Sequence, residues 1–201
     1  MSFISYLING ISLGSVYAII ALGYTMVYGI AKMLNFAHGD IIMVGGYAAF
    51  ISMNSLGVNP ILAVILSVVI CTILGLVIER VAYRPLRNAS SPLAVLITAI
   101  GVSYLLQNLA LLMFGADTKS FTSVVTVVLA GGKLTISGET IVTVLACMII
   151  MIGLTLFINK TKAGQAMLAV SEDRGAAQLM GINVNGTIAL TFAIGSALAA
   201  I

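Results

Sequence analysis

The chain has 201 residues, of which 61% are hydrophobic and only 7% charged, and its formal net charge is +3. Soluble globular domains carry about 25% charged residues, so this composition excludes a soluble domain with a polar surface exposed to water. No run of Lys and Arg interleaved with aromatic residues occurs, which leaves nucleic-acid binding without support. Cys71 and Cys147 each lie inside an apolar run, which is typical of small core residues rather than of a disulfide or a metal pair.

Apolar runs of membrane length recur along the chain, since a helix needs about 20 mostly apolar residues to cross a bilayer. The first run lacks the basic start of a signal peptide and is too long for one, so we expect a retained span. Two runs begin with proline, which the first turn of a helix tolerates. The five expected spans are Tyr6–Ile30, Phe36–Leu56, Pro60–Ala82, Pro92–Phe114 and Thr140–Ile158.

The stretch LNFAHGD, Leu34–Asp40, places the only histidine and an aspartate at the mouth of the second span. Asn35 is expected to cap this helix, and Asp40 to lie near its positive N-terminal end. His38 and Asp40 are two residues apart, so on a helix they point in different directions and form no proton-relay pair. Ionisable groups in a span usually face a bundle interior or a wet cavity. Asn35, His38 and Asp40 are therefore candidate pathway residues, with capping and packing favoured for Asn35 and the pathway for the other two.

The stretch ERVAYRPLR, Glu79–Arg87, follows the third span. Arg80 and Arg84 share a helical face and are expected to extend toward lipid phosphates, and Pro85 to end the helix. This pattern favours an anchor that fixes the orientation of the span.

The segment at residues 160–186 is expected to be a cytoplasmic loop that carries one short helix, from about Glu172 to Met180. Ser171 would cap that helix, with Glu172 and Asp173 at its positive end, and Gly181 would stop it. Ala176, Leu179 and Met180 would then form an exposed apolar face, which predicts a docking site for another protein. The alternative is an interfacial helix lying on lipid, which the acids and the lone Arg174 disfavour.

A sixth apolar run begins near Thr187 and is still apolar at Ile201. It is too short to cross a hydrocarbon core of about 30 Å at about 1.5 Å per residue. We therefore expect residues 1–201 to be one membrane domain that is truncated at its C-terminus.

The positions of Lys and Arg predict the orientation, because cytoplasmic loops carry the excess of basic residues. Seven of the nine lie on one side by the count of spans: Lys32, Arg80, Arg84, Arg87, Lys160, Lys162 and Arg174. On the other side, Lys119 and Lys133 are offset by Asp117 and Glu139. The sequence thus predicts an all-α, polytopic transmembrane bundle with about six spans and its N-terminus outside.

Small residues recur four apart in three of the runs, which lets helices approach closely in lipid. The three sets are Gly10, Gly14 and Ala18; Gly45 and Ala49; and Gly195 and Ala199.

Together these stretches resemble the permeases of branched-chain amino acid ABC importers, the inner-membrane components of binding-protein-dependent transport systems, which share a fold with ribose-type permeases. The resemblance covers the whole chain. Its carriers are GISLGSVYAIIALGYTMVYGIAKMLNFAHGD (Gly10–Asp40), ERVAYRPLR (Glu79–Arg87), LITAIGVSYLLQN (Leu96–Asn108) and GQAMLAVSEDRGAAQLMGINV (Gly164–Val184).

The resemblance implies a bacterial inner-membrane location and a subunit that couples ATP hydrolysis to alternating access. It implies as partners a second permease subunit, two ATPase subunits and an extracytoplasmic substrate-binding protein. Ser171 to Gly181 match the element that docks the ATPase, with Ala176, Ala177 and Gly181 at its packed end. The chain has no GxxxxGK[ST] motif, which suits a transport subunit that needs no cofactor and leaves hydrolysis to a partner.

The sequence alone leaves three alternative functions to consider. A permease of the same family for urea or a short amide would have similar spans. A self-sufficient secondary transporter or channel would need its own ion pathway, to which only His38 and Asp40 could contribute. A membrane-embedded enzyme is disfavoured, because no pair of catalytic groups converges within the spans.

Overall fold

A computed structural model describes residues 3–87, 92–120, 128–131 and 134–201, so Lys133 of the predicted outer side lies outside the described residues. The elements in chain order are α1 (Phe3–Ala31), α2 (His38–Asn54), α3 (Pro60–Ile78), the π-turn η1 (Glu79–Tyr83), the 3₁₀ turn η2 (Arg84–Leu86), α4 (Pro92–Phe114), β1 (Val128–Gly131), β2 (Leu134–Ser137), α5 (Gly138–Lys160), α6 (Lys162–Glu172), α7 (Arg174–Leu179) and α8 (Val184–Ala199).

All six predicted apolar runs form helices. Within the described ranges, four are long and apolar enough to cross a membrane: Tyr6–Ala31, Pro60–Leu86, Leu93–Phe114 and Thr140–Lys160. The other two runs give shorter helices, α2 with 17 residues and α8 with 16. The chain is therefore a multi-pass membrane protein with four full-length spans. The short α8 agrees with the prediction of a sixth run too short to cross, whereas α2 is shorter than the predicted second span.

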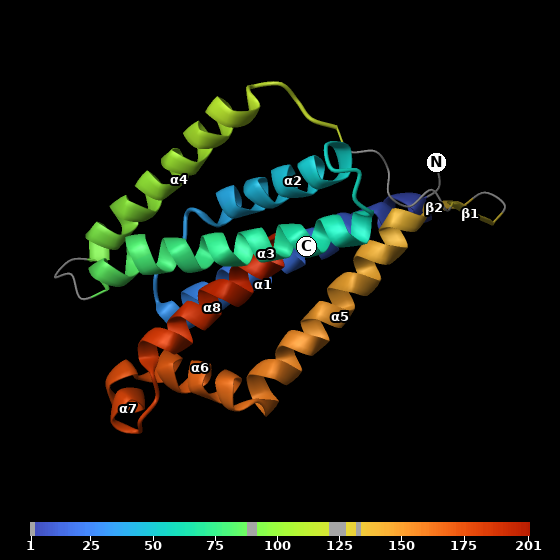
Figure 1. Cartoon of the computed structure of the whole chain (residues 1–201). Helices are drawn as coiled ribbons and strands as arrows, with labels where there is room; N and C mark the ends of the chain where they lie inside the picture. Colours follow the sequence, from blue (N-terminus) through green and yellow to red (C-terminus); the bar gives the residue numbers. More distant parts are fainter. Residues whose placement is uncertain (1–2, 88–91, 121–127, 132–133) are drawn as a thin grey trace.

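The helices form a bundle with two outlying members (Figure 1). α2 packs on α3, and α8 packs on both α1 and α3. α4 leans away from the bundle, whereas α5 meets α1 near the N-terminus and diverges from it toward α6. β1 and β2 form an antiparallel hairpin that pairs Val128 with Ser137, an exception to the all-helical prediction.

The buried core lies where α1, α2, α3, η1, α6 and α8 meet. Its largest fully buried side chains include Tyr83, Phe192, Ile41 and Met167. The outer surfaces of the long helices are apolar instead, and Leu112 of α4, for example, is 82% exposed. Such continuous apolar surface on long helices fits contact with lipid.

Glycines allow the bundle helices to cross closely. A Cβ added to Gly45 would lie 3.2 Å from both Cys71 Sγ and Ser67 Oγ, and one added to Gly195 would lie 2.8 Å from Val27 Cγ2. The predicted close approach is therefore confirmed at Gly45 and Gly195. It is not found at Gly10 and Gly14, where an added Cβ would meet no described atom within 4 Å.

The start and the end of α3 follow from local sequence. Asn59 caps the helix, since its side-chain oxygen accepts a hydrogen bond from the Ile61 amide at 3.1 Å, and Pro60 occupies the first turn. At the other end the helix widens into η1 and then tightens into η2, which contains Pro85. The predicted stop at this proline is confirmed.

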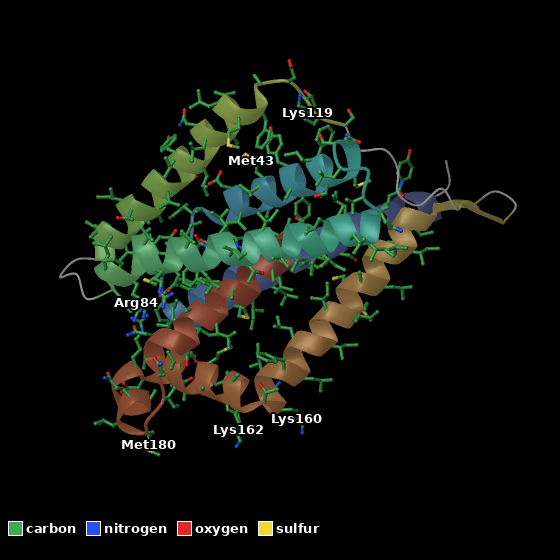
Figure 2. All side chains as sticks on the ribbon, in the orientation of Figure 1. Met43, Arg84, Lys119, Lys160, Lys162 and Met180 are labelled. Atoms are coloured by element: carbon green, nitrogen blue, oxygen red, sulfur yellow. The ribbon has the colours of Figure 1, made fainter. Side chains whose placement is uncertain are left out.

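The basic residues separate between the two ends of the molecule. Arg84, Lys160 and Lys162 lie toward the end that carries α7, whereas Lys119 lies at the opposite end (Figure 2). α1 begins at the end opposite to α7 (Figure 1). The fold thus keeps the charge separation on which the predicted orientation depends.

Candidate functional site

The segment after α5 turns sharply and runs back across the foot of the bundle. Gly164 is needed at this turn, because an added Cβ would lie 2.3 Å from the carbonyl oxygen of Ile158. Thr161 caps α6 by accepting a hydrogen bond from the Gly164 amide at 3.0 Å. The predicted loop therefore holds two helices, α6 and α7, instead of one.

The cap of α7 is Asp173, so the predicted capping role of Ser171 is wrong. The chain is extended at Asp173, whose Oδ1 accepts hydrogen bonds from the amides of Gly175 at 2.7 Å and Ala176 at 3.0 Å. Ser171 still belongs to α6 and donates its hydroxyl to the Leu168 carbonyl, 2.6 Å away. The helix starts later than predicted because two capping candidates stand close together, and the second one is used.

The end of α7 is as predicted. Gly181 has a φ of +83°, in the left-handed region that glycine adopts most easily. Its amide donates to the Gln178 carbonyl, and the Ile182 amide donates to the Ala177 carbonyl, both at 3.0 Å. This pair of bonds is the Schellman arrangement, which satisfies the last carbonyls of the helix.

One side of α7 is fixed to the bundle and its tip is free. Ala177 is buried in the core, and the Arg174 guanidinium donates a hydrogen bond to the carbonyl of Ala31 at the end of α1. Leu179 is 89% exposed and Met180 is 83% exposed. The predicted exposed apolar face is confirmed for these two side chains.

The other predicted coupling residues lie around this tip. Glu172, Asp173 and Ala176 are exposed, and Ser171 is half-buried. Of the three residues expected to pack, only Ala177 does so, since Ala176 and Gly181 are exposed.

Asn35 packs within the bundle but does not cap α2, so the predicted cap is wrong. α2 begins only at His38, after a turn in which the His38 amide donates to the Asn35 carbonyl at 3.1 Å. The buried Asn35 side chain instead accepts a hydrogen bond from the Tyr83 hydroxyl, with a distance of 2.9 Å between Tyr83 Oη and Asn35 Oδ1. Asn35 thereby connects the α1–α2 turn to η1.

His38 and Asp40 are both buried and face different helices, as predicted. The His38 ring lies edge-on to Tyr24 of α1, with the ring centroids 5.9 Å apart. Neither His38 nitrogen makes a hydrogen bond of normal geometry to the residues that the structure describes. Asp40, in the first turn of α2, accepts a hydrogen bond from Gln107 Nε2 of α4 at 3.0 Å.

A buried ion pair that the residue pattern does not predict lies beside these residues. Glu79 and Arg87, at the two ends of the η1–η2 segment, form a salt bridge whose side chains are 2% and 7% exposed. Arg87 also donates to the side chain of Asn185 in α8. Hydrogen bonds from Arg174, Tyr83 and Arg87 thus join α7, α1, η1 and α8 at one end of the bundle.

Comparison with known proteins gives the family. Residues 6–201 match the model of the family described as branched-chain amino acid transport system / permease component. The chain belongs to this permease family.

Several relatives of the chain are named as branched-chain amino acid transport permeases. The chain is 41% identical to the high-affinity branched-chain amino acid transport system permease protein BraD of Pseudomonas aeruginosa, over 99% of this chain and 69% of BraD. It is also 41% identical to LivH of Escherichia coli, over 99% of this chain and 68% of LivH. A probable LivH of Methanocaldococcus jannaschii is 31% identical over 91% of this chain and 59% of that protein. No solved structure matches the chain.

The Glu79–Arg87 pair of this permease left only a weak sequence signal. An acid at the end of an apolar run, eight residues before an arginine, resembles one more orientation anchor. Only the π-turn and the 3₁₀ turn between them bring the two side chains together, and neither turn follows from the residue pattern.

Proposed function

We propose that this chain is a membrane-spanning permease subunit of an ATP-driven ABC importer for branched-chain amino acids, in a bacterial inner membrane. Membership of the permease family and the names of the relatives support the substrate class. The proposed orientation puts the N-terminus outside and α7 in the cytoplasm, because the end with α7 carries most of the basic residues.

The observation on which the proposal rests most is the form of α7. It is a short helix outside the spans, with an exposed apolar tip at Leu179 and Met180. Its other side is tied to α1 through Arg174 and to the core through Ala177. A partner that pushed or pulled the tip would therefore move the ends of the bundle helices.

The bonds at this end offer a physical route for such a movement. α7 contacts α8 directly, and α8 is bonded to Arg87 through Asn185. Arg87 in turn pairs with Glu79 at the end of α3. The Glu79–Arg87 pair is buried and therefore costly to break, and the hydrogen bonds from Arg174 and Arg87 are charge-assisted. A shift of α7 would therefore be passed on to α1, α3 and α8 rather than absorbed locally.

The partners follow from this role. ATPase subunits would bind at Leu179 and Met180, a second permease subunit would complete the pathway, and an extracytoplasmic binding protein would deliver the amino acid. Asn35, His38 and Asp40 are proposed to face the inner end of the pathway. A proton-driven carrier is less well supported, because the two ionisable groups contact different helices and form no relay.

Uptake by the full-length complex in proteoliposomes tests the proposal. With the binding protein present, labelled leucine should accumulate when ATP is supplied and should continue to accumulate when the proton gradient is collapsed. Labelled urea should not accumulate under the same conditions. Uptake that follows the proton gradient, or uptake of urea in place of leucine, would refute the proposed function.

A further inference from the structure

A cavity lies beside α7 and is not explained by ATPase docking or by a transport pathway. It has a volume of about 490 Å³ and lies between the end of α1, η2, the start of α4 and α7. This volume is within the range of small-molecule sites, about 300–1,000 Å³. Its walls include Lys32, Arg87, Arg174, Leu34, Leu86 and Leu93.

The polar part of this cavity is strongly basic. Lys32, Arg87 and Arg174 line it, and none of its described lining residues is acidic. Glu79 neutralises one of these three charges from behind, through its salt bridge to Arg87. Burial, and after it the positive charge of Arg87, lower the pKa of Arg174, as expected when two like charges lie close together. A bound anion would relieve this repulsion.

Arg87 has unused hydrogen-bonding capacity at this site. Its two terminal nitrogens donate to Asn185 and Glu79, but its Nε is buried and has no hydrogen-bond partner among the described residues. A buried donor without a partner costs about 1–3 kcal/mol, so the protein itself does not satisfy all the donors of the Arg87 guanidinium.

The backbone at Lys32 is a second, independent sign of a built site. Lys32 follows the last residue of α1 with a φ of +51°, the one non-glycine residue in the described chain with a positive φ. Glycine or asparagine usually takes this position after a helix, because a longer side chain is strained there. A lysine at this position places a positive charge on the rim of the cavity in spite of that strain.

The rest of the wall is apolar and belongs to membrane helices. Leu34, Leu86 and Leu93 line it, and Leu93 lies in the first turn of α4, a membrane-length helix with little buried surface. Leu93 itself is 62% exposed. The cavity therefore joins a basic end to a lipid-facing apolar surface, at the end of the bundle where Arg84 and the tip of α7 lie (Figure 2).

We propose that this cavity binds one anionic phospholipid from the cytoplasmic leaflet. Lys32, Arg87 and Arg174 bind the phosphate, and the acyl chains lie along Leu34, Leu86 and Leu93. Basic pockets between membrane helices on the cytoplasmic side are a known solution for anionic head groups. Because Arg174 also holds α7 to α1, the lipid would brace the coupling helix, although its binding does not depend on the substrate transported.

Lipid retention by the full-length complex, purified in detergent, tests this assignment by native mass spectrometry. The probes are phosphatidylglycerol, which is anionic, and phosphatidylcholine, which has no net charge. Wild type should retain phosphatidylglycerol in preference to phosphatidylcholine. The Lys32→Gln variant should bind it about fivefold more weakly, the factor expected for one basic residue at an anionic surface.

Matched variants separate charge from folding. Lys32→Gly relieves the positive φ, so it should fold at least as well as wild type and still bind the lipid about fivefold more weakly. Lys32→Arg should keep the lipid. Lys162→Gln removes a positive charge at the same end, outside the cavity, and should bind like wild type.

Three outcomes would overturn the proposal. Equal retention of the two lipids would show that charge is not recognised, and unchanged binding in Lys32→Gln and Lys32→Gly would place the lipid elsewhere. Displacement of phosphatidylglycerol by millimolar inorganic phosphate would mean that the site recognises free phosphate rather than a lipid.

Discussion

Arg174 of α7 donates a hydrogen bond to the main-chain carbonyl of Ala31, the last residue of α1. Carbonyls at the end of a helix lack partners within the helix and attract positive charge. The bond therefore gives the last carbonyl of α1 a hydrogen-bond partner and also holds α7 to α1. It joins two residues that are 143 positions apart in the sequence.

Arg174→Ala should uncouple hydrolysis from transport, because α7 would lose its tie to α1. A hydrogen bond to a charged group contributes about 1.5–3 kcal/mol. Leucine transported per ATP hydrolysed should fall, with partial recovery in Arg174→Lys, which keeps a donor. The measurement is uptake and phosphate release in the same proteoliposomes. A lowered ratio in Lys32→Gln as well would assign the effect to the cavity instead of the bond to Ala31.

Asp40 should respond differently to loss of charge and loss of hydrogen bonding. Asp40→Asn keeps an acceptor for Gln107 and should assemble normally but change the transport rate. Asp40→Leu removes the hydrogen bond from Gln107, whose Nε2 keeps only Ser103 as a partner, and should lose transport while the complex stays intact. Amounts of purified complex and initial uptake rates give the answer. Wild-type transport in Asp40→Asn, with only less complex in Asp40→Leu, would reduce Asp40 to a packing residue.

His38→Gln removes the ring that lies against Tyr24 but keeps hydrogen-bonding groups of similar reach. If His38 faces the pathway, leucine uptake should fall while the amount and thermal midpoint of the complex change little. Tyr24→Phe keeps the ring contact and serves as the control, with near-normal uptake expected. Normal uptake in His38→Gln would leave His38 a role in packing alone.

Gly75→Ala should destabilise the bundle at the crossing of α3 and α8. The added Cβ would lie 1.9 Å from Ser196 Oγ and 2.6 Å from Ser196 Cβ, so rotation of the serine cannot relieve the clash. Overpacking of this kind costs about 1–3 kcal/mol. The thermal midpoint of the purified protein should fall, and Gly75→Ala combined with Ser196→Gly should recover it. Gly153→Ala, where an added Cβ meets nothing within 4 Å, should show no loss.

The predictions from sequence succeeded where one residue type serves one local purpose. Apolar runs gave the six helices, Pro60 marked the start of α3, and Gly181 marked the end of α7. They failed at positions where two candidates compete within three residues. Ser171 and Asp173 are both good capping residues, but α6 continues through Ser171, and only at Asp173 does the backbone become extended so that a new helix can start.

Contacts between distant segments could not be read from the sequence at all. Asn35 has the residue type of a helix cap, but its side chain instead accepts a hydrogen bond from the hydroxyl of Tyr83, 48 positions later in the sequence. The Gly10–Gly14 spacing is the same as that of Gly195 and Ala199, yet only the second set meets a neighbouring helix in the described chain. Residue spacing identifies a face that can pack closely, whereas the topology determines which face does.

Cross-linking from the tip of α7 tests the central claim most directly. Cysteine replaces Met180 in the full-length complex with its ATPase subunits, and the natural Cys71 and Cys147 are buried. Controls place cysteine at Lys162, on the same end, and at Ser120, on the opposite end. We predict that only Met180→Cys cross-links to an ATPase subunit and that the cross-link stops leucine uptake. A cross-link from Ser120→Cys, or none from Met180→Cys in a complex that transports, would contradict the account.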